Sequence, residues 1–165
     1  MSQSKTFQFS GIPTSVAEFS ALPEAVLSDP FQAAALTVLA LCRYCSDPQM
    51  GIDMLNAIKG PQPLSVYEQQ FLRDRLSGKA YVPYSYFAGT SVENNYTPTS
   101  PLTITIKDDP YSYAEDGYAK LLIQSSGADQ LRPIKLRRKG QAQWFLWEQF
   151  LLPDIRQPAK DDPWA

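Results

Sequence analysis

The sequence contains no histidine, and this absence removes several kinds of active site. Nucleophiles that depend on a histidine base are excluded, and so are metal sites built on imidazole. The sequence also lacks a glycine-rich phosphate loop ahead of a helix. Carboxylate, lysine or tyrosine chemistry is what remains for an enzyme. We identify no catalytic residue, no metal-ligand set and no cofactor motif.

Long hydrophobic runs are also missing. The longest uncharged apolar stretch extends from Phe31 to Cys42, well short of the roughly 20 residues that a membrane helix needs. The opening residues MSQSKTFQFS lack the apolar core of a signal peptide. With two cysteines and no export signal, we expect a cytoplasmic protein in a reducing compartment, without a membrane partner.

An excess of one charge sign is absent as well. The net charge is −2, from 15 basic and 17 acidic residues, so the whole molecule has no strong field to attract nucleic acid. We therefore expect no nucleic-acid partner. A length of 165 residues fits one domain, and we expect a single domain over residues 1–165.

Proline, by contrast, is abundant, with 14 residues spread along the chain. Asp29 and Asp47 each precede a proline, which places an N-cap carboxylate before the first helical position. Ser65 and Glu68 stand at the spacing of a capping box. The first predicted helix is apolar around most of its circumference, so we expect it at the centre of the fold. The predicted helices cover about residues 30–45, 48–59 and 65–78, within a helical part of about residues 13–78.

The second half of the chain changes character. In about residues 79–101 the apolar residues follow neither the helical period of about 3.6 nor the strand period of two, and tyrosine is frequent. This pattern predicts a long ordered loop. Apolar and polar residues then alternate with a period of two, which predicts an antiparallel meander of about four strands over residues 102–152. Residues 153–165 are predicted as an extended tail. The fold class is α+β, with N-terminal helices packed on a C-terminal sheet.

Five runs of the sequence stand out together: SGIPTS at 10–15, LPEAVLSDPF at 22–31, ENNYTP at 93–98, DPYSYAEDGYAK at 109–120 and QWFLWEQFLLPDIRQPAKDDPWA at 143–165. They resemble an uncharacterised family of small bacterial proteins, a domain of unknown function. The resemblance covers nearly the whole chain and implies a bacterial, full-length, single-domain protein with no assigned activity. The final strands, RPIKLRRKG and QWFLWE, are similar to those of cone-shaped NTF2-like domains, which include enzymes, carriers and binding modules.

Cys42 and Cys45 form a Cys-x-x-Cys pair in the last turn of the predicted central helix. A redox pair sits at a helix N-terminus, where the helix dipole stabilises the thiolate. At the C-terminal end of a helix the dipole destabilises a thiolate. We therefore interpret both cysteines as structural.

Residues 118–147 carry six basic side chains and one acidic one, a local excess of positive charge. The alternation predicts that Lys120, Lys135 and Arg137 share one solvent-exposed face of the sheet, with Trp144 beside them. Such a face could bind an acidic or phosphate-bearing partner. The alternative is that these side chains simply keep an open sheet face soluble.

The loop from Tyr81 to Tyr96 is the other candidate site. Tyrosine and asparagine together offer apolar area and adaptable hydrogen bonds, as binding loops do. The alternative is a cover, strapped across the sheet by its own rings. The candidate binding residues in this loop are Tyr84, Tyr86, Asn94, Asn95 and Tyr96.

Two function hypotheses follow. The first is a non-enzymatic binding or adaptor protein, with a protein or small-ligand partner on the loop and the adjoining sheet face. The second is an NTF2-like pocket enzyme or small-ligand carrier that uses Glu93, Glu115 or a tyrosine. This alternative requires a carboxylate inside a concave apolar pocket.

Two expectations concern tryptophans. Trp144 and Trp147 are three residues apart on one predicted strand, so they should point to opposite faces, and we expect Trp147 to face the core together with Phe145. Trp164, in the tail, is expected to dock on its own domain, because a large ring is costly to leave in water.

Overall fold

The helices begin where the sequence predicts. Asp29 and Asp47 each accept a hydrogen bond from the backbone N–H three residues further on, and Ser65 forms a complete capping box with Glu68. The three predicted helices are thus confirmed. In the computed structural model, which describes residues 2–165, the helical elements are α1 (Val16–Ser20), η1 (Pro23–Val26), α2 (Pro30–Ser46), α3 (Pro48–Lys59), α4 (Val66–Leu76), α5 (Tyr81–Tyr84) and η2 (Ala159–Asp161).

Over residues 2–165 the strands form one five-stranded antiparallel sheet, in which each strand pairs with the next along the chain. The α+β class is confirmed, but the predicted number of strands was one too few. The missed strand lies near the N-terminus, where only two phenylalanines alternate with polar residues, and its partner is far away in sequence. The strands are β1 (Ser4–Phe9), β2 (Leu102–Lys107), β3 (Tyr118–Ile123), β4 (Arg132–Lys139) and β5 (Gln143–Gln149).

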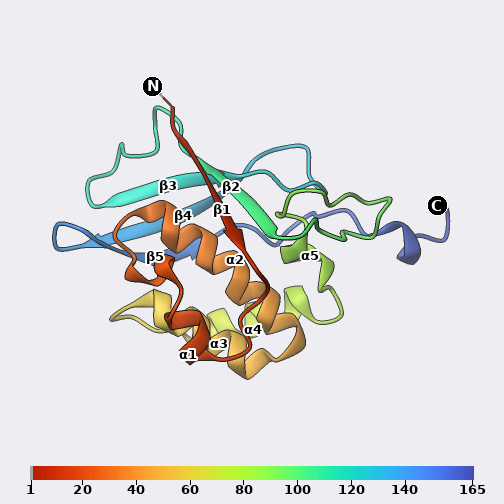
Figure 1. Ribbon diagram of the computed structural model, residues 1–165, viewed down its shortest axis with the longest axis horizontal. Coiled ribbons are helices and arrows are strands. Elements are labelled where there is room, and N and C mark those ends of the chain that lie inside the picture. The colour runs from red at the N-terminus through yellow and green to blue at the C-terminus, as the bar shows by residue number, and fades with distance from the viewer. Residues whose placement is uncertain (1) are drawn as a thin grey trace.

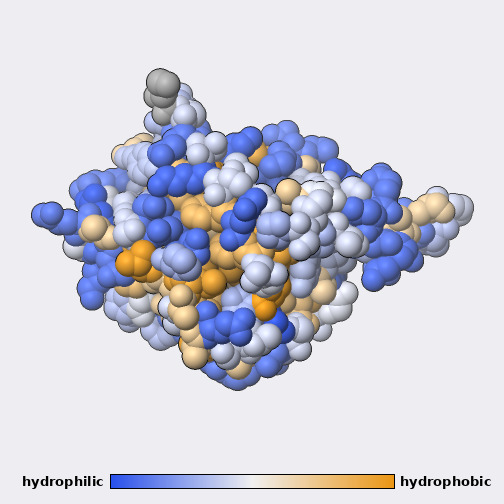
Figure 2. All heavy atoms as spheres, viewed as in Figure 1, coloured by the Kyte–Doolittle hydropathy of each residue, from blue (hydrophilic) through white to orange (hydrophobic). Residues whose placement is uncertain are grey.

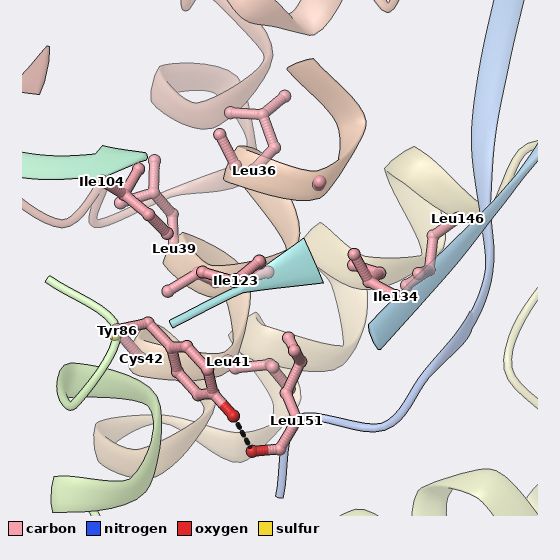
Figure 3. Packing of buried hydrophobic residues seen from close by; sticks show 14 of the residues in the cluster. Leu36, Leu39, Leu41, Cys42, Tyr86, Ile104, Ile123, Ile134, Leu146 and Leu151 are labelled. Atoms are coloured by element: carbon pink, nitrogen blue, oxygen red, sulfur yellow. Dashed lines mark hydrogen bonds between the residues drawn. The ribbon is translucent and has the colours of Figure 1, made fainter. Parts of the chain in front are cut away.

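Helix α2 is the centre of the core, as its all-round apolar sequence predicts. Leu36 and Leu39 are fully shielded from solvent, and the curled sheet contacts the helix through Ile104, Ile123 and Ile134 (Figure 1, Figure 3). Hydrophobic residues that remain visible gather in the middle of one face, surrounded by hydrophilic ones (Figure 2). Each helix within the described residues is too short or too polar to cross a membrane.

Strand β5 alternates regularly from Trp144 to Trp147 and then contains a β-bulge that redirects Glu148. Lys135 pairs with Glu148 and Leu136 pairs with Leu146, so Trp147 is the additional residue between them. Leu146 is buried with α2, and Trp144, on the same face, packs against the core. Trp147 lies on the opposite, outer face. The tryptophans do point apart, but the prediction that Trp147 faces the core was wrong.

The tail is anchored along most of its length. Tyr96 Oη donates to the carbonyl of Arg156 at 2.6 Å, and the N–H of Ala159 donates to the carbonyl of Val92 at 3.0 Å. Beyond this anchor Trp164 is 93% exposed, so the expectation that its ring docks on its own domain was wrong. The tail projects from one end of the body (Figure 2).

Candidate functional site

The outer face of the sheet is the face turned away from α2. Lys120 lies directly opposite Lys135 in the β3–β4 pair, and Tyr118 lies opposite Arg137. The intervening residue Ala119 is buried on the other side. As the period of two predicts, Lys120, Lys135 and Arg137 therefore share one face.

Two aromatic rings lie among these cations. Lys135 Nζ is 4.5 Å from the centre of the Tyr118 ring, and the Arg137 guanidinium is 5.5 Å from it. The same guanidinium is 4.6 Å from the Trp147 ring, which meets Tyr118 edge to face at 5.8 Å. Each contact is favourable because a cation is attracted to the face of an aromatic ring. We call Tyr118, Lys120, Lys135, Arg137 and Trp147 the basic–aromatic face.

The cations of this face differ in how they are neutralised. Lys135 Nζ donates to Glu115 Oε2 at 2.8 Å, and this hydrogen bond raises the pKa of Lys135. Lys120 and Arg137, by contrast, have no carboxylate within 4.0 Å among residues 2–165. Two exposed positive charges therefore remain available to an acidic group from outside.

A hollow of about 400 Å³ continues this face toward the turn between β4 and β5, and we call it the hairpin hollow. Phe145 and Leu146 give it apolar walls, and Trp147 joins it to the basic–aromatic face. Gly60 packs against it: its φ of +69° favours glycine, and a Cβ there would be 2.7 Å from the Phe145 ring. The lining residues are Lys59, Pro61, Gln62, Arg137, Arg138, Lys139, Gly140, Phe145, Leu146 and Trp147.

Lys59 fixes the edge of β5, the strand that contributes to both the basic–aromatic face and the hairpin hollow. Its side chain is 6% exposed, and Nζ donates to Glu68 Oε2 and to the carbonyl of Trp147, both at 3.2 Å. Burial disfavours the ionised form of Glu68, but hydrogen bonds from the Ser65 backbone and Lys59 outweigh it, and the pKa of Glu68 is lowered. The ion pair thus ties α3, α4 and β5 together and holds the backbone of Trp147 in place.

The predicted tyrosine loop has a different role for most of its residues. Tyr86 and Tyr96 are buried, and Tyr86 Oη donates to the carbonyl of Leu151 (Figure 3). Asn94 accepts hydrogen bonds from the backbone N–H groups of Ser91 and Thr97, so it shapes the turn. Alanine at Tyr86 or Tyr96 would therefore remove core packing as well as any contact surface.

The remaining loop candidates border a separate open hollow of about 470 Å³ beside the tail. Tyr84 is half-buried there, and Asn95 accepts a hydrogen bond from the N–H of Lys160 at 2.9 Å. Trp144, the last candidate, faces the core side of β5. The structure thus brings together the three basic candidates and separates them in role from the loop and from Trp144.

The two cysteines lie in the last turn of α2, as predicted. Cys42 is buried and Cys45 half-buried, and both are free. Burial raises the pKa of the Cys42 thiol and raises that of Cys45 to about 11. Both thiols are thereby held in the protonated, weakly nucleophilic form.

Sequence reasoning missed Tyr118 and Trp147. For Tyr118 a signal was present, because it stands two residues before Lys120 and must share its face. For Trp147 the period of two held, but the choice of core face was wrong: Trp144 and Leu146 face the core, whereas Phe145, which pairs with the outer residue Arg137, and Trp147 face outward. The apolar area of Trp147, which we had assigned to the core, is covered by Tyr118 and Arg137 instead.

Comparison with known protein families gives a match. A model of a family described as a domain of unknown function (DUF6935) matches residues 11–159. No curated protein and no solved structure matches the chain, so the architectural similarity to NTF2-like domains stays a prediction.

Proposed function

The chain belongs to this family of unknown function, and from its own residues we propose that it is a non-enzymatic binding protein whose basic–aromatic face takes an acidic partner. One observation carries the proposal. Arg137 is exposed, has no carboxylate partner among residues 2–165, and has its guanidinium 5.5 Å from the centre of the Tyr118 ring and 4.6 Å from that of Trp147.

The arrangement favours binding because its parts are already in position. Trp147 is fixed through its carbonyl by Lys59, and Tyr118 is held between Lys135 and Arg137. An acidic group that meets Arg137 therefore needs little ordering of the protein, which reduces the entropic cost of association. The partly exposed rings of Tyr118 and Trp147 beside the cations add area for an apolar part of the same partner.

The enzymatic alternative has less support. Glu93 and Glu115 are both exposed, and Glu115 is paired with Lys135 on the outer face. Neither carboxylate lines the hairpin hollow or the hollow beside the tail. A bacterial cytoplasmic setting remains part of the proposal, supported by the two free thiols.

The proposal is tested with a polyglutamate chain of about 20 residues as an acidic probe, at low and at physiological salt. We expect the double variant Lys120→Gln with Arg137→Gln to bind it roughly fivefold more weakly or worse, because two unpaired cations are lost. Binding of the unaltered protein should weaken as salt rises.

The matched control is Arg73→Gln with Lys79→Gln, which removes the same charge from exposed positions away from the sheet. It should bind the probe like the unaltered protein. If both double variants lose affinity equally, the probe senses net charge alone and the basic–aromatic face is not the site.

A further inference from the structure

The projecting end of the tail is an acidic and aromatic segment. Asp161, Asp162 and Trp164 stand within four residues, and Trp164 is 93% exposed. Neither aspartate is within 4.0 Å of a cationic group in the described part of the chain. A ring of this size would gain free energy if it were buried against a partner.

The segment is presented in a defined way. The tail is anchored up to Lys160, whose N–H donates to Asn95 at 2.9 Å. The N–H of Trp164 then donates to Asp162 Oδ1 at 2.9 Å, which fixes a turn with the ring beyond it. The anchor and the turn reduce the freedom that the segment would lose on binding.

The hairpin hollow has the complementary composition. Arg137, Arg138 and Lys139 supply positive charge, and Phe145 and Trp147 supply aromatic walls. Arg138 meets the fully exposed Asp116 at 3.6 Å in a surface ion pair, which is weak in water, so another carboxylate can replace Asp116.

The hollow and the segment lie at opposite ends of the molecule. In Figure 1 the turn between β4 and β5 is at one end of the long axis, and the C-terminal residues are at the other; Figure 2 shows the tail pointing away from the body. One copy therefore cannot place its tail in its own hollow. If the two surfaces pair, they therefore pair between copies.

We propose that the hairpin hollow binds the segment Asp161–Trp164 of a second copy of this chain, with Trp164 against its apolar walls and the aspartates on Arg138 and Lys139. This inference rests on the proposed function, since it names an acidic partner for the hollow that shares Arg137 and Trp147 with the basic–aromatic face. The contact joins two different surfaces, so it is head-to-tail and leaves a free hollow and a free tail on each pair. Because the segment is short, the association is weak and depends on concentration.

The first test is sedimentation of the full chain over a range of protein concentrations. The unaltered protein should self-associate, less so at high salt, and Trp164→Ala should weaken this at least about tenfold, as for loss of a central aromatic anchor. Trp164 is exposed, so the variant keeps the fold. Self-association that Trp164→Ala leaves intact, or a protein that stays monomeric at every concentration, would overturn the proposal.

A mixing experiment tests the head-to-tail geometry. Trp164→Ala keeps its hollow, and the double variant Arg138→Gln with Lys139→Gln keeps its tail, so each alone should be monomeric. Mixed together, they should form one-to-one pairs that cannot extend. Absence of pairs in the mixture would contradict the proposal, because each surface still has its intact counterpart.

The polyglutamate probe separates this inference from the proposed function. Trp164→Ala leaves the basic–aromatic face unchanged and should bind the probe like the unaltered protein. Probe binding without self-association would refute the second copy as partner and leave the binding face standing. If the variants Lys120→Gln with Arg137→Gln and Arg73→Gln with Lys79→Gln lose equal affinity for the probe, the proposed function itself is refuted.

Discussion

Arg137 shows how one side chain acquires a role from its neighbours. Its sequence context marks it as basic and exposed, and its guanidinium lies 4.6 Å from the Trp147 ring and 5.5 Å from the Tyr118 ring, two contacts that favour this position over others. An arginine on an open strand otherwise loses much conformational freedom when it binds. The two rings remove part of that cost before a partner arrives.

At the same scale, the thiols give a direct test of burial. Because the pKa of Cys45 is about 11 instead of 9.0, its thiolate fraction at pH 8 is about a hundredfold smaller than that of an ordinary thiol. We expect native protein to react slowly with a maleimide, and faster as the pH rises toward 11. Unfolded protein should react rapidly at both cysteines. Stoichiometric labelling of the native protein within minutes at pH 7 would show that the pair is reactive.

At the scale of elements, β5 carries a core residue and a binding residue in close succession. The bulge at Trp147 lets Leu146 remain in the core while Trp147 and Glu148 both turn outward. A regular strand would have returned Glu148 to the core face. The bulge is therefore what keeps the charged Glu148 out of the core.

This arrangement predicts unequal costs for the two tryptophans. Trp144→Ala should lower the free energy of unfolding by about 2–4 kcal/mol, somewhat below the value for a fully buried aromatic, because Trp144 packs on the core but is partly exposed. Trp147→Ala should lower the free energy of unfolding by about 1–2 kcal/mol, because it removes the contacts of this ring with Tyr118 and Arg137. Urea denaturation of both variants measures the difference. A larger loss at Trp147 would place its ring in the core.

The elements also show which features the sequence could predict. Helix starts were predictable because caps at Asp29, Asp47 and Ser65 are local chemistry. The shared face of Lys120, Lys135 and Arg137 was predictable because the strand period is fixed. Strand β1 was not predictable, since its partner β2 is distant in the chain, and the bulge was not, since no local pattern in β5 marks it.

At the scale of the molecule, the tyrosine loop and the tail form one connected layer beside α2 and the sheet. Tyr96 stacks on Tyr81 at 5.7 Å and donates to the tail at Arg156, while Tyr86 donates to Leu151. The sequence identified these tyrosines as important but could not show that their hydroxyls face inward. Their partners are carbonyl groups some 60 residues further along the chain.

Tyr96→Phe tests this connection. The ring stays in place, but the hydrogen bond to the carbonyl of Arg156 is lost, so we expect a loss of about 0.5–1.5 kcal/mol in stability. Amide exchange at Ala159 and Lys160 should become faster, because the tail opens more often. The control Tyr113→Phe removes an exposed hydroxyl and should change neither quantity measurably. Unchanged exchange in the tail of Tyr96→Phe would mean that other contacts hold it.

The pairing of β1 with β2 has a consequence for biosynthesis. Thr6 and Thr105, whose hydroxyls lie 2.9 Å apart across this pair, are separated by 99 positions in the chain. A ribosome that adds roughly 5–20 residues per second needs about 5–20 s to travel that distance. During this interval the nascent β1, with Phe7 and Phe9, has no strand to pair with, while α2 can already form. The emerging chain therefore needs its first strand shielded, by its own helices or by a chaperone, until translation reaches β2.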